Sequence, residues 1–268
     1  MTEVQNRLLE MLKWFHELCE KENLTYYAQG GTVLGAVRHN GFIPWDDDID
    51  VGMPRNDYEK FIKLQKKTNG KSQYYIEYPN DKKDFVYPYC KVYDTKTTLI
   101  ENTRYKTKRG IYIDVFPIDG IGNSIEESIK NFKKIDNKKN LLCTQICALR
   151  KGRKLYKNLS ILLLRTIPFL DSLKIIKDID KSSKSYDYDN CEYVANLCGN
   201  WHEKEIMKKQ WVIKPILCKF ENTSIYIPED YDAYLTRMYG DYMKLPPIEK
   251  QVTHHDFLYL DLNKSYLE

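Results

Sequence analysis

The sequence lacks disulfide motifs, a secretion signal and long hydrophobic runs. Its seven cysteines form an odd set with no Cys-x-x-Cys pair, which argues against a disulfide framework. No signal-like segment opens the chain, and no apolar run reaches the ~20 residues that a membrane-spanning helix needs. These absences predict a cytoplasmic protein whose cysteines are reduced.

Acidic residues are scarce in one lysine-rich stretch, although the net charge of the whole chain is only +4. We expect no nucleic-acid partner. The solvated face of a helix accounts best for such a run, and contact with an anionic membrane surface or a phosphorylated acceptor is the alternative. The basic residues of this stretch are Lys130, Lys133, Lys134, Lys138, Lys139, Arg150, Lys151, Arg153, Lys154 and Lys157.

The longest apolar run, residues 161–170, follows this basic stretch and is interrupted by Arg165 and Pro168. Its length favours a buried helix over one that lies on a membrane surface. Peripheral contact with the inner face of the membrane therefore stays open as an expectation.

The composition is that of an ordered protein, with 42% hydrophobic residues and 22 tyrosines among 268. Helical spacing and a capping box between Thr2 and Gln5 predict a first helix that ends near Asn23. Apolar patterns and turn residues predict the later elements. We expect strands at 26–28, 74–78, 89–93, 97–100 and 111–116, helices at 32–38, 56–67 and 231–239, and a helical region from 121 to 184.

A change of composition near residues 120–124 suggests two parts. We expect a catalytic core of the α/β (α+β) class over residues 1–120, with a mixed sheet and flanking helices. Residues 121–268 are expected to form a mostly helical region that completes the site.

Four aspartates crowd five positions, a cluster that repels itself unless cations are near. Asp46, Asp48 and Asp50 alternate with apolar residues, so a strand would place these three carboxylates on one face. Asp47 falls on the apolar side, where a structural role fits better. Carboxylate oxygens in a row suit Mg²⁺ or Mn²⁺. The run therefore predicts a metal-binding strand.

A glycine pair stands upstream of the acidic run. Gly30 and Gly31 lie between a predicted strand and a predicted helix, where backbone N–H groups and the helix N-terminus favour a phosphate. Thr32 can cap that helix and offer its hydroxyl to the same phosphate. The pair predicts a phosphate site beside the predicted metal site.

A third carboxylate, Asp114, stands alone in a strand of apolar and aromatic residues. Carboxylates are rarely buried without a partner. A third metal ligand beside Asp48 and Asp50 is the preferred interpretation, and a salt bridge to a nearby Lys or Arg is the alternative. Arg38 and Lys91 could contact phosphates of a donor, or could serve only in structural ion pairs.

Other interpretations of the acidic run are weaker or remain open. An EF-hand fails because the glycine is one position late and the twelfth position is not Glu. The diphosphate motif of prenyl synthases sits on a helix, which Pro44 and the alternation oppose. An Asp-x-Asp site of a nucleotide-sugar glycosyltransferase survives, as does a non-catalytic module with a degenerate site.

The residues around both predicted sites resemble the signature of the LicD family, which belongs with fukutin-type proteins in the nucleotidyltransferase-fold superfamily. The main match is residues 30–53, GGTVLGAVRHNGFIPWDDDIDVGM. Residues 110–119, 239–243 and 245–247 are also similar, so the resemblance extends over nearly the whole chain.

The resemblance implies a phosphotransferase with a nucleotidyltransferase-like core. Such an enzyme would move phosphocholine or a similar phospho-alkyl group from a CDP-activated alcohol to a hydroxyl of a glycan or lipid-linked glycan, such as a precursor of lipopolysaccharide or teichoic acid. Gly30, Gly31 and Thr32 would contact donor phosphates. Asp48, Asp50 and Asp114 would be the catalytic, metal-binding carboxylates, and whether Asp46 also binds the metal is open. His254 and His255 are left out of this set, because a carboxylate can accept the proton instead.

Overall fold

The computed structural model describes residues 1–79, 84–150, 152–167, 170–253 and 257–268. The helices are α1 (Glu3–Lys21), α2 (Gly30–His39), α3 (Arg55–Lys63), α4 (Gln65–Thr68), α5 (Ile125–Ile146), α6 (Leu155–Arg165), α7 (Ser172–Ser183) and α8 (Tyr231–Tyr239). The described residues also form the short 3₁₀ helices η1 (Tyr188–Asn190), η2 (His202–Glu205), η3 (Lys209–Trp211) and η4 (Ile248–Lys250).

The strands are β1 (Tyr27–Ala28), β2 (Asp50–Pro54), β3 (Tyr74–Glu77), β4 (Cys90–Asp94), β5 (Thr98–Glu101), β6 (Lys108–Arg109), β7 (Tyr112–Gly122), β8 (Tyr193–Asn196), β9 (Ile206–Lys208), β10 (Ile216–Phe220), β11 (Thr223–Ile227) and β12 (Phe257–Asp261). The main sheet has the order β1-β2-β7-β4-β3, and β8 joins it through β7 and carries β9. Strands β2 and β7 are parallel, whereas β4 and β8 pair with β7 in the antiparallel sense. This mixed sheet with flanking helices confirms the predicted fold class.

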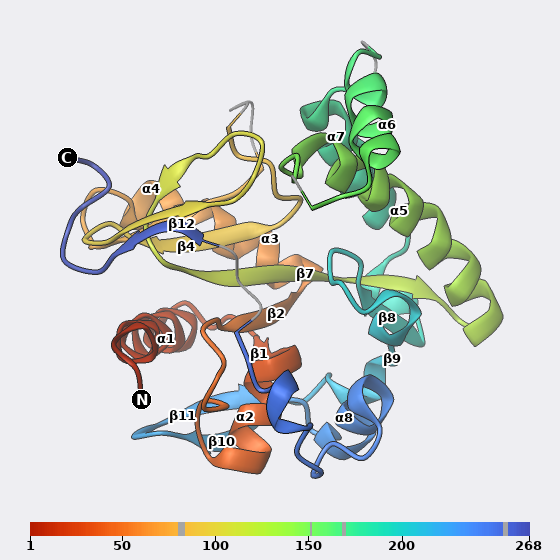
Figure 1. Ribbon diagram of the computed structural model, residues 1–268. Coiled ribbons are helices and arrows are strands. Elements are labelled where there is room, and N and C mark those ends of the chain that lie inside the picture. The colour runs from red at the N-terminus through yellow and green to blue at the C-terminus, as the bar shows by residue number, and fades with distance from the viewer. Residues whose placement is uncertain (80–83, 151, 168–169, 254–256) are drawn as a thin grey trace.

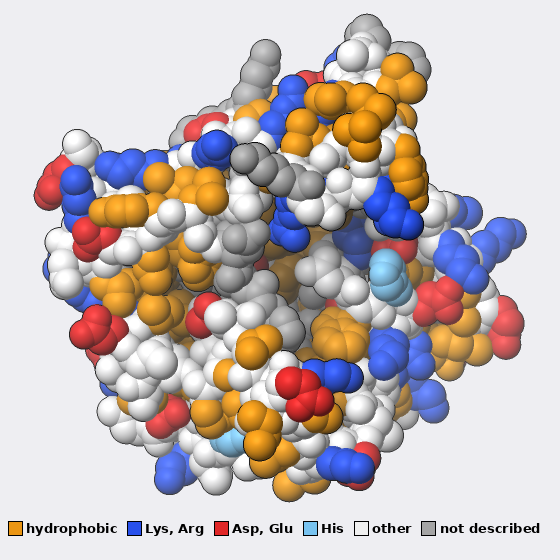
Figure 2. Space-filling model, in the orientation of Figure 1, with side chains coloured by type: hydrophobic (Ala, Val, Ile, Leu, Met, Phe, Trp, Pro, Cys, Tyr) orange, Lys and Arg blue, Asp and Glu red, His pale blue; other side chains and the backbone are white. Residues whose placement is uncertain are grey.

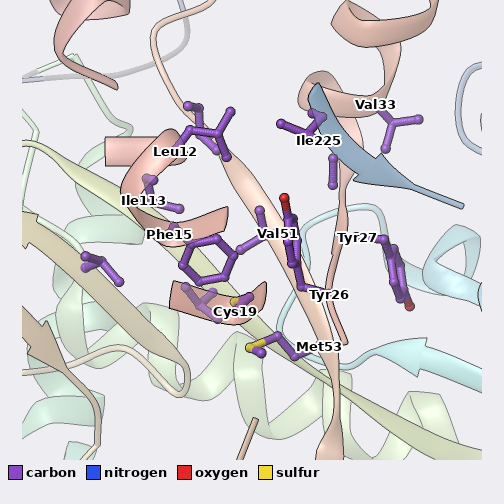
Figure 3. Close-up of a cluster of buried hydrophobic side chains, with 14 of the residues drawn as sticks. Leu12, Phe15, Cys19, Tyr26, Tyr27, Val33, Val51, Met53, Ile113 and Ile225 are labelled. Carbon is purple, nitrogen blue, oxygen red and sulfur yellow. The ribbon is translucent and has the colours of Figure 1, made fainter. Parts of the chain in front are cut away.

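The apolar face of the sheet is covered by α1. Leu12, Phe15 and Cys19 project from this helix toward Val51 of β2 and toward Ile113 of β7 (Figure 3). All five side chains are buried, as the helical and strand periodicities predict. The capping box of α1 also forms, because the Thr2 hydroxyl accepts from the Gln5 backbone N–H at 3.1 Å and the Gln5 side chain accepts from the Thr2 N–H.

The acidic run is the main correction to the predicted elements. Residues 46–49 have no regular secondary structure, and β2 begins only at Asp50. Residues 43–46 form a turn, which the Asp46 N–H closes by donating to the Ile43 carbonyl at 2.9 Å. The Gln5 side chain donates to the Ile43 carbonyl at 3.2 Å and to the Asp46 carbonyl at 2.8 Å. These bonds hold residues 43–46 in a turn rather than in an extended strand. The predicted alternation of Asp46, Asp48 and Asp50 along one strand is therefore wrong.

Two helices also differ from expectation. The helix predicted at 56–67 is divided at Leu64 into α3 and α4. The apolar run at 161–170 was predicted to be buried, yet α6, which contains its first half, has no buried residue. Pro168 lies outside the described residues. The short strand before the glycine pair, the end of the first helix near Asn23 and the helix at 231–239 are confirmed.

A second apolar cluster lies at the far end of β7, where α5 and α7 pack together. Phe132, Ile135 and Leu142 of α5 meet Ile176 of α7 there. Figure 1 shows α5, α6 and α7 together at the end of the molecule away from α1. The part after residue 120 holds these helices and strands β8–β12, and β7 itself runs through residue 120. The division into two domains stays a prediction.

Candidate active site

The strand register places three charged side chains in a row across the sheet. Asp50 of β2 is directly opposite Asp114 of β7, and Asp114 is directly opposite Lys91 of β4. Residues directly opposite each other share a face of the sheet. Two carboxylates and one ammonium therefore stand side by side, although their positions in the sequence span 65 residues, from Asp50 to Asp114.

Lys91 is enclosed. Only 1% of the residue is exposed, and its Nζ lies 2.8 Å from Asp114 Oδ1. The same Nζ lies 3.2 Å from the ring centre of Tyr112 and 4.2 Å from that of Tyr87, so aromatic faces surround the cation. The Tyr89 hydroxyl donates to the other Asp114 oxygen at 3.3 Å. The salt bridge that was the alternative for Asp114 is thus present, and it fixes this carboxylate in place.

The two carboxylates differ in their balance of charge. Burial raises the pKa of Asp114 to about 6, against the opposing effect of the Lys91 ammonium. Burial also raises the pKa of Asp50 well above its usual range, and the charges of Asp48, Asp114 and Asp46 raise it further. Asp50 is therefore the carboxylate that a further positive charge would stabilise most.

The glycine pair brings the N-terminus of α2 against these acids. Gly30 has a φ of +50°, a conformation that suits glycine. A Cβ added to Gly31 would lie 2.6 Å from Asp46 Oδ2, and one added to Gly30 would lie 3.7 Å from Asp50 Oδ2. The absence of side chains thus admits two carboxylates to the start of the helix.

Two tyrosines of α8 complete this corner, and sequence reasoning did not assign them to the site. The Gly30 N–H donates to the Tyr234 hydroxyl at 2.9 Å, so this amide already has a partner. The Tyr239 hydroxyl lies 3.7 Å from the position of a Cβ on Gly30. The similarity of residues 239–243 to the family signature was the one sequence signal for Tyr239, and its position beside the glycine pair was not deducible.

Thr32 has a different role from the predicted cap. Gln29 occupies the N-cap position of α2, and no side chain caps the helix. The Thr32 hydroxyl instead accepts a hydrogen bond from the Asp50 backbone N–H at 3.0 Å. It therefore ties α2 to the first residue of β2.

Arg38 stands in the last turn of α2, away from the glycine pair. Its guanidinium donates to the Tyr242 carbonyl at 2.7 Å and so holds the segment that follows α8. The phosphate contacts predicted for Arg38, Lys91 and the glycine pair stay predictions. His254 and His255 lie outside the described residues.

The oxygen donors fit a divalent cation that is shared with a ligand. Asp50 and Asp114 face the same side, and Asp46 and Asp48 add negative charge around Asp50. Among the residues that the structure describes, no three His, Cys, Asp or Glu side chains form a group that could hold an ion by itself. Mg²⁺ commonly takes one or two carboxylates and completes its shell with phosphate oxygens and water. A two-carboxylate site of this kind matches the donors present.

An open groove of about 790 Å³ lies beside this corner, between α5 and η2. Trp201 lines it, and the Trp201 ring makes an edge contact with Tyr239 at 5.1 Å between ring centres. Asp136, Asn137 and His202 add polar groups to the lining. Tyr239 therefore stands between the acidic site and a groove with an aromatic wall.

Comparison with known proteins gives a family for this arrangement. Residues 23–142 match the family model described as LicD/FKTN/FKRP, nucleotidyltransferase domain. All the predicted site residues fall inside that match.

Individual relatives agree with the family model. The chain is 31% identical over 259 residues to lipopolysaccharide cholinephosphotransferase LicD of Haemophilus influenzae. The aligned region covers 95% of this chain and 96% of the relative. A shorter match, 39% identical over 46 residues, links it to the human ribitol 5-phosphate transferase FKRP and covers 17% of this chain and 9% of that protein. With a relative of this identity aligned over nearly its full length, the chain belongs to the LicD family.

Proposed function

We propose that this protein transfers a phospho-alkyl group, phosphocholine or a similar one, from a CDP-activated alcohol to a hydroxyl of a cell-surface glycan or its lipid-linked precursor. The carboxylate pair Asp50 and Asp114 carries the proposal, because its register places two acids beside a helix N-terminus. The full-length similarity to a cholinephosphotransferase supports the reaction type.

In the proposed reaction the acceptor hydroxyl attacks the donor phosphorus that bears the alcohol. A new bond forms between the acceptor oxygen and that phosphorus, the bond to the bridging oxygen breaks, and CMP leaves. The hydroxyl proton passes to a carboxylate. Asp114, with a pKa of about 6, is suited to accept it near neutral pH.

A divalent cation, Mg²⁺ or Mn²⁺, would be held by Asp50 and Asp114 with Asp48 nearby, and Asp46 against Gly31 is the further candidate. When bound, the ion would neutralise charge that develops on the phosphate oxygens. Lys91 keeps the Asp114 carboxylate in its orientation through the 2.8 Å ion pair. The N-terminus of α2 offers positive potential to the donor phosphates.

The groove beside Trp201 is the proposed place for the acceptor. An exposed indole ring provides a flat apolar surface for the face of a sugar, and the neighbouring Asn137 and Asp136 can bond its hydroxyl groups. Tyr239 lies between this groove and the corner that holds Asp50, with its ring against Trp201 and its hydroxyl near Gly30. An acceptor seated there would direct one hydroxyl toward the carboxylate pair.

The test is CMP release from CDP-choline, CDP-ribitol and CDP-glycerol, with Mg²⁺ and a glycan acceptor. Asp50→Asn and Asp48→Asn should each abolish release, whereas Asp178→Asn on the surface of α7 should retain it. Full activity in both site variants would overturn the assignment of these carboxylates.

The nucleotide-sugar alternative is separated by a thermal shift. A donor that binds the folded protein raises the apparent stability by mass action. CDP-alcohols should raise the melting temperature in Mg²⁺, and UDP- or GDP-sugars should not. The reverse pattern would favour a glycosyltransferase.

A further inference from the structure

Helix α6 presents an apolar stripe to the outside of the molecule. Leu155, Leu159 and Leu163 recur at helical spacing and are 74%, 55% and 70% exposed. Tyr156 and Leu162 lie beside them on the same side and are also exposed. The less exposed residues of the helix, among them Leu164 and Arg165, face the other way. A surface helix usually has the opposite arrangement, with its apolar stripe facing the core.

Polar contacts rather than apolar burial hold α6 to its neighbour α5. The Gln145 side chain donates to the Leu164 carbonyl at 3.2 Å, and Arg165 donates to the Thr144 carbonyl at 3.2 Å. These bonds use the inner side of the helix and orient it. The hydrogen bonds between α6 and α5 therefore keep the apolar stripe of α6 facing outward.

The surroundings of the stripe carry charge of one sign. Residues 137–170 contain no Asp or Glu and eight Lys or Arg. Arg150, Lys154 and Lys157 are exposed next to or on α6. Earlier in the run, Lys138 pairs with Asp178 at 2.7 Å and Lys133 pairs with Glu203 at 3.0 Å. Figure 2 shows orange side chains gathered on the protruding end of the molecule where α6 lies, with blue side chains around them.

We infer that α6 lies in the surface of an anionic lipid membrane, with its leucine stripe in the acyl boundary and the basic residues among the headgroups. Apolar area and positive charge together are what bind an interfacial helix. With 11 residues the helix is about 16 Å long, too short to cross a bilayer. No helix among the described residues is long and apolar enough for that.

A membrane suits this face better than a second copy of the chain. Two copies packed through α6 would bring together two segments, residues 137–170 of each copy, that carry eight basic residues and no acidic one, and their charges would repel. Anionic headgroups complement the same charges. Membrane binding through α6 is independent of the reaction proposed above.

Vesicle flotation of the full chain tests it. We expect binding to vesicles of equal parts phosphatidylglycerol and phosphatidylcholine, and little binding to phosphatidylcholine alone. The double substitution Leu159→Glu with Leu163→Glu should lower the bound fraction at least about tenfold, because it removes apolar contact and adds negative charge. Raising the salt concentration should weaken binding as well.

The matched control replaces two exposed apolar residues elsewhere, Ile213→Glu with Leu217→Glu, which are 50% and 57% exposed. This variant should bind vesicles as the unaltered chain does. Far-UV circular dichroism and the melting temperature establish that both variants fold. Equal vesicle binding by the α6 variant and the unaltered chain overturns the inference. So does a dimer in solution that the α6 substitutions dissociate while vesicles bind neither protein.

Discussion

At the scale of single residues, the two central carboxylates of the site differ in the charges around them. Asp114 has a buried ammonium at 2.8 Å, whereas Asp50 is surrounded by three other acids. Removing one partner of a buried ion pair leaves a charge without compensation. Removing one member of a like-charged cluster relieves repulsion instead. Replacing Asp114 by Asn should therefore destabilise the fold, whereas the same substitution at Asp50 should not.

The first prediction follows from this contrast. In the presence of EDTA at pH 7.5, Asp114→Asn should lower the free energy of unfolding by about 3 kcal/mol, because Lys91 loses its partner. Asp50→Asn should leave it unchanged or raise it by about 1 kcal/mol. Urea unfolding measures both values. A loss of similar size in the two variants would contradict the assigned charge balance.

The second prediction concerns the glycine pair. Gly31→Ala would place a Cβ 2.6 Å from an Asp46 oxygen and displace that carboxylate. We expect CMP release to fall by roughly tenfold or more, since a misplacement near 1 Å can cost about two orders of magnitude in rate. Gly70→Ala is the control, because Gly70 has a φ of +79° with nothing within 4 Å of the added Cβ. It should cost stability without changing the rate of the folded enzyme.

At the scale of elements, η2 depends on a buried acid. The Glu205 carboxylate accepts from the Trp201 N–H at 3.2 Å and is almost fully buried. Burial raises its pKa to about 7. The folded protein therefore holds the Glu205 proton more tightly than the unfolded chain does.

The third prediction is the pH dependence that results. The stabilising contribution of protonated Glu205 is fully present below about pH 4.5 and is lost as the pH rises through about 7. The change is at most about 3 kcal/mol, at 1.36 kcal/mol for each pKa unit. Glu205→Gln should remove this part of the slope between pH 5 and 7.5, as urea unfolding at both pH values would reveal. An unaltered slope in the variant would place the titrating group elsewhere.

At the scale of the whole molecule, one buried arginine joins the two parts of the chain. Arg55 of α3 binds the buried Asp119 of β7 through two bonds of 2.6 Å and Asp180 of α7 through one of 3.0 Å. A bidentate pair of this kind fixes both distance and orientation. The α5–α7 end is thereby connected to the main sheet.

The fourth prediction tests this connection. Arg55→Met should lower the free energy of unfolding by about 3–5 kcal/mol, because Asp119 would remain buried without its partner. Lys60→Met is the control, since Lys60 pairs with Asp57 at the surface and should cost at most about 1 kcal/mol. We also expect a single transition with coincident midpoints by circular dichroism and tryptophan fluorescence. Two separate transitions would support independent domains divided near residue 120.

Much of the fold was predictable because its signals are local. The capping box of Thr2 and Gln5, the apolar alternation at 111–115 and the periodicity of α8 each act within a few residues. The strand predicted at the acidic run was wrong because a contact with a residue distant in the sequence outweighs the local pattern. Its alternation has the period of a strand, but residues 43–46 form a turn, which the Gln5 side chain, 41 positions away from Asp46, supports by donating to two of its carbonyls.

The sequence by itself determined which chemical groups the site contains: four clustered aspartates, a glycine pair and a solitary Asp114. Only the tertiary structure decided how they are arranged. It paired Lys91 with Asp114, brought Tyr234 to Gly30 across 204 positions, and turned the leucines of α6 outward. Strand register and the packing of distant helices set these contacts, and neither leaves a short-range pattern in the chain.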